Sequence, residues 1–154
     1  MKFTCTYPWG STYSKKLMSF LEVMEIPWVQ DPRRAGSDCW GFLISKSQAA
    51  LDICVADIQK RLEEANACME AWDQASSKGK EKVLESYGFF CDEDIWEHPW
   101  EAEEKDVVEV STDWKHLEID DHGEKLRKIG VAMTYEYVKN DEGKQDIIVT
   151  IRPL

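Results

Sequence analysis

Residues 92–98 form the densest group of side chains that could bind a metal ion or take part in catalysis. Five of these seven positions supply oxygen or nitrogen ligands, namely Asp92, Glu93, Asp94, Glu97 and His98. Hard cations such as Ca²⁺ and Mg²⁺ prefer oxygen ligands, but an EF-hand loop needs glycine at its sixth position, where this segment has Glu97. A metal-dependent enzyme that uses this acidic cluster is therefore an alternative, and the sequence predicts no metal site.

Other residue types with reactive side chains lack the spacing that their chemistry needs. The three histidines form no paired metal-binding pattern, and neither a phosphate-binding nor a dinucleotide-binding glycine pattern occurs. The five cysteines are odd in number and include no C-x-x-C pair, which favours free thiols in a reducing compartment. We therefore predict no catalytic residue and no cofactor. The cysteines are Cys5, Cys39, Cys54, Cys68 and Cys91, and the histidines are His98, His116 and His122.

The negative charge of the chain is concentrated in one stretch. The whole sequence has 30 acids and 19 bases, for a net charge of −11. Residues 85–124 contain 15 acids and two bases, a net charge of −13, whereas the other 114 residues carry +2. Such a charge disfavours direct binding to nucleic acid or to anionic membranes and favours basic partners.

Two tryptophans lie within the densest part of this acidic stretch. Trp96 and Trp100 are interleaved with carboxylates, and Pro99 separates Trp100 from His98. One interpretation is that the indoles anchor a loop to the core while the acids face water. The other is a binding epitope, with tryptophan as anchor and carboxylates that meet arginine and lysine on a partner. The sequence does not decide whether these indoles are buried or exposed.

Length and composition indicate an ordinary globular chain. It has 154 residues, 43% hydrophobic and 11% aromatic, which is enough apolar material for a core. No apolar stretch typical of a signal peptide follows Met1, and no run approaches the ~20 residues needed to cross a bilayer. Without a linker, a repeat or a low-complexity tract, we expect one cytoplasmic domain over residues 1–154, with an acidic, loop-rich segment at about 92–121.

Hydrophobic periodicity predicts an α+β fold with a mixed or antiparallel sheet. Strands are expected at 2–6 and 39–44, near 107–110 and within 115–120, and helices at about 11–24 and 80–87. The strand-forming runs 131–138 and 146–152 flank a short turn that contains glycine, which is typical of a C-terminal β-hairpin. Residues 92–106 show no clear period and are interpreted as loop, with a turn at 120–123.

The strongest structural signal is a long helix at about 48–75, packed on the sheet. Its apolar residues step by three and four positions, Ser47 is suited to cap its start, and Gly88 is suited to end the shorter helix that follows. The seam is also compatible with a homodimer, or with an assembly or regulatory subunit that acts through this helix. The seam consists of Leu51, Val55, Ile58, Leu62, Ala65, Met69 and Trp72.

In size, acidity and lack of a catalytic pattern, the chain resembles the small acidic inhibitors of phages and mobile elements, including anti-CRISPR and nucleic-acid-mimic proteins. The resemblance implies a protein that occupies a basic site on a partner, a site that in such partners binds nucleic acid. We therefore predict a protein-binding inhibitor rather than an enzyme. The expected partner-binding residues are Asp92, Glu93, Asp94, Trp96, Glu97, Trp100, Glu101, Glu103, Glu104 and Asp106.

Overall fold

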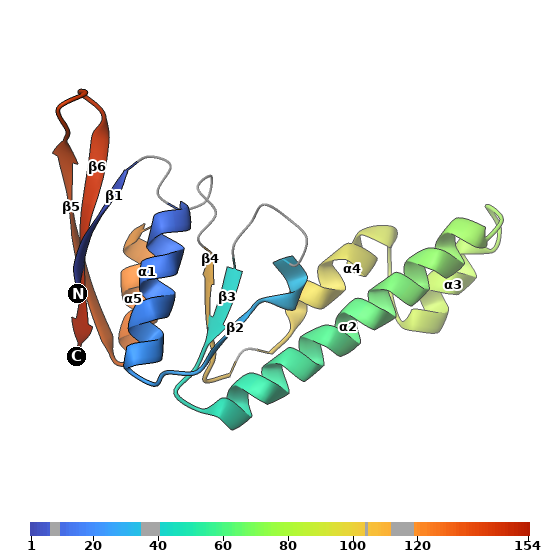
Figure 1. Ribbon diagram of the computed structural model, residues 1–154. Helices are drawn as coiled ribbons and strands as arrows, with labels where there is room; N and C mark the ends of the chain where they lie inside the picture. Colours follow the sequence, from blue (N-terminus) through green and yellow to red (C-terminus); the bar gives the residue numbers. More distant parts are fainter. Residues whose placement is uncertain (7–9, 35–40, 104, 112–118) are drawn as a thin grey trace. The chain divides into compact units, whose positions relative to one another are not determined.

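The computed structural model describes residues 1–6, 10–34, 41–103, 105–111 and 119–154 (Figure 1). The chain forms two compact units. The first comprises residues 1–51 and 106–154, and the second comprises residues 52–105. The strands all belong to the first unit, whereas the second unit is helical in the part of the chain that the structure describes.

The first sheet of the larger unit has one buried and one exposed face. Its strand order is β1 (Lys2–Thr6), β6 (Gln145–Pro153) and β5 (Val131–Lys139), and both pairings are antiparallel. Phe3 and Cys5 on β1 are buried, as are Ile147, Val149 and Ile151 on β6, at every second position. Strict alternation of this kind is what an antiparallel sheet with one solvated face requires.

The second sheet of this unit is shorter and more deeply buried. Its strand order is β2 (Trp28–Gln30), β3 (Gly41–Ile44) and β4 (Val108–Ser111), again antiparallel. All four residues of the central strand β3 are buried, which explains why this segment of the sequence is continuously apolar. The short 3₁₀ helix η1 (Pro32–Arg34) follows β2.

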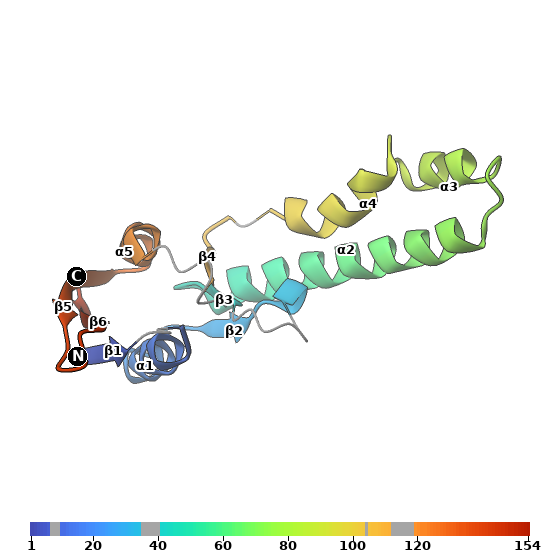
Figure 2. The same ribbon diagram turned by 90° about the horizontal axis from the view of Figure 1, so that it is seen from above.

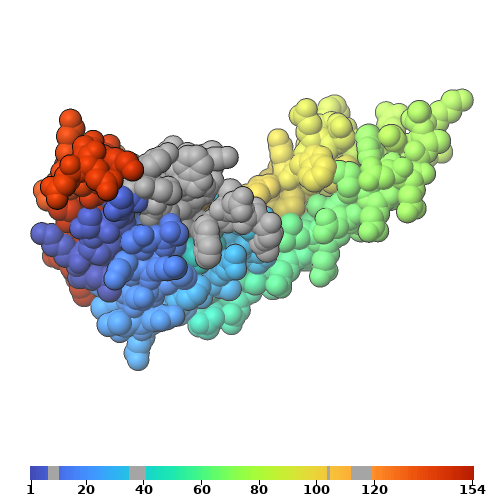
Figure 3. Space-filling model, turned by 45° about the horizontal axis from the view of Figure 1, so that its top comes forward, coloured from blue at the N-terminus to red at the C-terminus, as the bar shows by residue number. Residues whose placement is uncertain are grey.

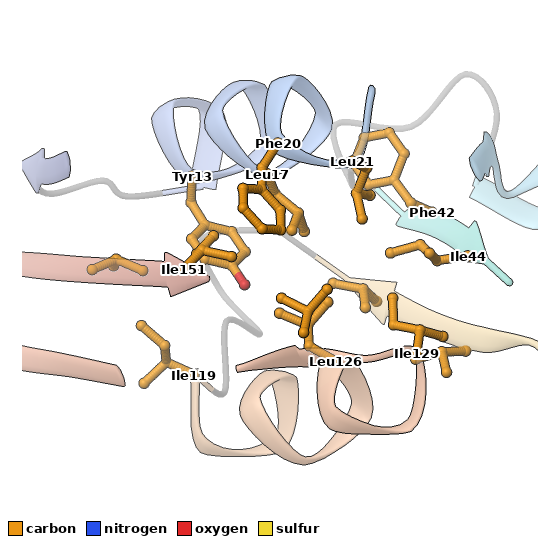
Figure 4. Close-up of a cluster of buried hydrophobic side chains, with 14 of the residues drawn as sticks. Tyr13, Leu17, Phe20, Leu21, Phe42, Ile44, Ile119, Leu126, Ile129 and Ile151 are labelled. Atoms are coloured by element: carbon orange, nitrogen blue, oxygen red, sulfur yellow. The ribbon is translucent and has the colours of Figure 1, made fainter. Parts of the chain in front are cut away.

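Two helices complete the core of the larger unit. α1 (Gly10–Val23) buries Tyr13, Leu17 and Leu21, while α5 (Ile119–Lys128) buries Leu126. Figure 4 shows the labelled side chains of α1 and those of α5 pointing toward one another, with strand residues between them. They form one apolar cluster with the buried residues of both sheets.

A buried ionic network joins η1 to β4. The Arg33 side chain is 1% exposed and makes ion pairs to Asp31 at 2.9 Å and to Glu109 at 3.2 Å. Arg34 also pairs with Glu109, at 3.1 Å, and its aliphatic stem lies across Gly41, where a Cβ would collide with it. The four charges therefore compensate one another, and removal of either arginine would leave a carboxylate without full compensation in a poorly solvated site.

The smaller unit is built along the long helix α2 (Gln48–Gln74), whose first residues belong to the larger unit. α3 (Lys80–Tyr87), α4 (Asp92–Glu97) and the 3₁₀ helix η2 (His98–Glu101) follow it, and Figures 1 and 2 both show α3 and α4 alongside α2. Their shared apolar cluster contains Ala65, Cys68, Leu84 and Ile95, with Met69, Trp72, Val83 and Phe89 packed against it.

The main elements expected from the sequence are confirmed. The fold is α+β, the long helix spans 48–74, and β5 and β6 form the C-terminal hairpin. The Ser47 hydroxyl accepts a hydrogen bond from the Ala50 amide at 3.2 Å, as expected of an N-cap. Gly88 ends α3 in the left-handed region, with φ of 75°. The single domain expected over residues 1–154 stays a prediction.

Several local expectations differ from the structure. Residues 92–101 are helical rather than loop, the strands form two sheets rather than one, and the turn expected at 120–123 lies inside α5. Ile119, His122 and Leu126 are buried at spacings of three and four, so a short amphipathic helix prevails over the turn-forming residues Asp120 and Gly123. Of the strand expected at 115–120, residues 115–118 lie outside the described residues, and the remainder is helical. None of the helices that the structure describes is long and apolar enough to cross a membrane.

His122 is an ionisable group inside the core of the larger unit. It is 3% exposed, and its ring lies 5.3 Å from that of Tyr13, centroid to centroid. Burial lowers the pKa of His122 from 6.5 to about 4, while a hydrogen bond with the Ser111 backbone acts in the opposite direction. The imidazole is therefore neutral in the folded protein at neutral pH.

We expect the protein to lose stability between about pH 6.5 and pH 4 because of His122. The unfolded chain takes up a proton in this window and the folded chain does not, so the free energy of unfolding should fall by about 3 kcal/mol in total. Above this window both states are neutral at this position, and below it both are protonated. Urea unfolding at pH 7 and pH 4.5, for the native chain and for His122→Gln, measures this contribution by difference.

An independent NMR titration of the His122 ring protons in the folded native chain does not depend on whether the variant folds. Protonation of the ring near pH 6.5 would contradict the expectation.

Candidate functional site

The predicted binding residues lie largely on one helical stretch, in which α4 continues directly into η2. The start of α4 is fixed by a capping box: the Asp94 carboxylate accepts hydrogen bonds from the amides of Phe90 at 2.8 Å and Cys91 at 3.1 Å. Asp92 and Glu93 stand in the first turn, where the helix dipole favours acids. Pro99 falls in the first turn of η2, where the lack of an amide hydrogen costs little.

One side of this stretch is attached to the rest of the smaller unit by apolar contacts. Ile95 is 1% exposed and packs in the cluster with Ala65, Cys68 and Leu84. Pro99, one turn later, is also buried. This spacing of four residues sets which side of α4 and η2 faces the unit and which faces outward.

The opposite side carries tryptophans and carboxylates. Trp96 is 65% exposed and Trp100 is 48% exposed, so neither indole is the buried anchor that one interpretation of the sequence expected. The acids between and beside them are exposed as well. We call this set the acidic-aromatic surface, and the segment that bears it (yellow) lies at the molecular surface along α2 (Figure 3). It consists of Asp92, Glu93, Trp96, Glu97, Trp100 and Glu101.

His98 supports this surface from behind. Its Nε2 lies 2.8 Å from a Glu64 carboxylate oxygen, and its Nδ1 lies 3.4 Å from an Arg61 guanidinium nitrogen. Because a guanidinium can only donate, Nδ1 is the acceptor, and Nε2–H donates to Glu64. Arg61 also donates to the His98 carbonyl at 3.3 Å and pairs with Asp57. The histidine therefore links η2 to α2.

The remaining predicted residues have other positions. Asp94 caps α4, and hydrogen bonds from the Phe90 and Cys91 amides hold its pKa below the usual value. Glu103 is exposed just beyond η2, and Glu104 lies outside the described residues. Asp106 belongs to the larger unit, where its carbonyl accepts a hydrogen bond from Ser45 at 2.7 Å. The structure thus brings together six of the ten predicted residues in one surface.

A metal site built from this acidic cluster would need Asp92, Asp94 or Glu97 to converge with His98. Asp94 instead accepts hydrogen bonds from backbone amides, and His98 contacts Glu64 and Arg61. Within the described ranges, no group of three or more histidine, cysteine, aspartate or glutamate side chains is placed to hold a metal ion.

Exposed aromatic residues at the α3–α4 junction were missed from the sequence. Phe90 is 97% exposed and Tyr87 is 38% exposed, whereas Phe89 packs against the apolar cluster and stacks with Tyr87 at 6.3 Å between ring centroids. Phe89 and Phe90 are adjacent and identical in type, so no local signal distinguishes the inward ring from the outward one. The apolar exposure next to α4 is therefore larger than the two tryptophans alone provide.

The seam of α2 that could have mediated a homodimer is partly occupied by the chain itself. Ala65 and Cys68 are buried, and Met69 and Trp72 pack in the same cluster as residues of α3 and α4. Lys80 also places its ammonium 5.0 Å from the centroid of the Trp72 ring. A homodimer through Leu51–Trp72 stays a prediction. The C-terminal part of the seam already packs against α3 and α4 of the same chain, so it has less apolar surface available for a second copy.

Comparisons with protein-family models, with curated proteins and with solved structures find no match.

Adjacent substitutions on α4 should separate its structural side from its exposed side. We expect Ile95→Ala to lower the free energy of unfolding by about 2–4 kcal/mol, because a 1%-exposed side chain is removed from a packed cluster. Trp96→Ala should change it by about 0.5 kcal/mol or less, since the indole is mostly solvated. Urea denaturation monitored by far-UV circular dichroism measures both changes. A loss of similar size in the two variants would show that the Trp96 indole is buried in solution.

Proposed function

We propose that this protein binds a basic protein partner through the acidic-aromatic surface. The observation that carries the proposal is the exposure of Trp96 and Trp100 beside four carboxylates on one helical stretch. Tryptophan is enriched among the residues that dominate binding energy at interfaces, and exposed apolar surface rimmed by polar residues is typical of interaction sites.

The negative charge around the indoles favours a partner whose binding surface is positively charged. No lysine or arginine occurs in residues 85–104, and the acids of α4 and η2 other than the capping residue Asp94 are exposed. A concentrated negative surface accelerates encounter with positive surfaces and repels acidic ones, nucleic acid included. We expect the carboxylates to steer and orient the partner, and the indoles to provide the apolar area that is buried on binding.

A partner whose basic site normally binds nucleic acid fits this surface best. Such sites present clustered arginine and lysine for phosphate oxygens, and carboxylates on an exposed helix can occupy the same positions. The protein would then act as an inhibitor by competition, in keeping with the resemblance of the chain to small acidic inhibitors. No catalytic group is needed for this activity.

A charge reversal with a matched control tests the proposal. We expect the triple change Glu93→Lys, Glu97→Lys and Glu101→Lys to abolish capture of the partner in pull-downs from the native host. The control reverses three exposed acids of the C-terminal hairpin, Glu136, Asp141 and Glu142, and alters net charge equally. It should capture the partner as the native chain does.

The captured partner should also be lost at high salt and displaced by added nucleic acid, because screening weakens exposed charge contacts. Equal capture by the native chain and by the Glu93, Glu97 and Glu101 variant, with an unchanged circular dichroism spectrum, would refute the proposal.

A further inference from the structure

The two indoles of the acidic-aromatic surface belong to one continuous helical stretch. Trp96 and Trp100 are four residues apart across the junction of α4 and η2, and both are at least 48% exposed. The surface therefore offers two exposed indoles within five successive residues rather than one.

Carboxylates surround these rings at helical spacing. Asp92 precedes Trp96 by four positions and Glu93 precedes it by three, while Glu97 precedes Trp100 by three and Glu101 follows it directly. All four acids are exposed. Each indole thus has one carboxylate about one helical turn before it and another directly after it in sequence.

This combination suits a planar cation. A guanidinium that stacks on an indole directs its N–H groups outward in its own plane, where carboxylates beside the ring can accept them. A lysine ammonium is not planar and is more strongly hydrated than a guanidinium. It therefore stacks less well on the ring while it contacts the carboxylates.

The smaller unit already contains one contact of this general type. The ammonium of Lys80 lies 5.0 Å from the centroid of the Trp72 ring, so an intramolecular cation covers that indole. In the part of the chain that the structure describes, no such cation lies over Trp96, although it is more exposed than Trp100. The Trp96 indole is 65% exposed, so its ring is accessible to a cation from another molecule.

We propose that the acidic-aromatic surface recognises an arginine-rich segment of its partner, with guanidinium groups stacked on Trp96 and Trp100 and held by the adjacent carboxylates. This inference rests on the proposed function and narrows it from basic partners in general to partners that present arginine. A partner whose basic site consists mainly of lysine should bind more weakly at equal charge.

Hexa-arginine and hexa-lysine peptides, titrated into the full-length protein by calorimetry, test the inference. We expect the native chain to bind hexa-arginine about tenfold more tightly, since each exposed cation–π contact with arginine contributes roughly a two- to fivefold gain in affinity. The double variant Trp96→Leu and Trp100→Leu should lose most of this preference while its affinity for hexa-lysine changes little. Trp96→Phe, which keeps an aromatic ring, should retain part of it.

Two controls keep the outcomes distinct. Tyr137→Leu removes a 47%-exposed aromatic from the β5–β6 hairpin and should leave both affinities unchanged. Glu93→Gln, Glu97→Gln and Glu101→Gln together should weaken the binding of both peptides.

Equal affinities of the native chain for the two peptides, or a double tryptophan variant that keeps the arginine preference, would overturn the inference and leave charge-led binding intact. Unchanged binding of both peptides to the triple glutamine variant would overturn the proposed function as well.

Discussion

The burial of Ile95 against α2 and α3 is the contact on which the candidate surface depends. Ile95 packs with Ala65, Cys68 and Leu84, and Pro99 repeats the inward position one turn later. Because successive residues of a helix point in different directions, the inward positions of Ile95 and Pro99 leave the residues that directly follow them, Trp96 and Trp100, exposed. The exposure of Trp96 and Trp100 thus follows from the packing of their neighbours, and the acidic-aromatic surface is held on a packed scaffold rather than on a loop.

Polar contacts add direction to that packing. The Asp94 capping box determines where α4 begins, and His98, held between Glu64 and Arg61, fixes η2 after the regular helix has ended. Asp94 and His98, two potential metal ligands, therefore hold α4 and η2 in place through their hydrogen bonds. A rigid, pre-organised surface loses less conformational entropy on binding, which favours recognition by a short helical segment with few anchors.

The larger unit places its charged groups differently. There, Asp31, Arg33, Arg34 and Glu109 compensate one another in a largely buried network, and His122 is held neutral inside an apolar core. These groups are bound into the fold and are not displayed for a partner. The acidic stretch of residues 85–124, with a net charge of −13, is shared between the two units. Its part in the smaller unit, residues 85–105, carries the exposed acids of the acidic-aromatic surface, and residues 106–124 belong to the larger unit.

The sequence alone determined the elements with strong local signals. These are the long helix with its Ser47 cap, the helix end at Gly88, the C-terminal hairpin, the α+β class and the position of the acidic stretch, since each depends on residues close together in the chain. Tertiary structure alone decided the rest. The helical turn at 92–101 has only two inward residues, too few to show a period, and Ile95 becomes an inward position only when Leu84 and Cys68 lie beside it. Phe89 and Phe90 are chemically identical, so their opposite exposures could come only from contacts between segments distant in sequence.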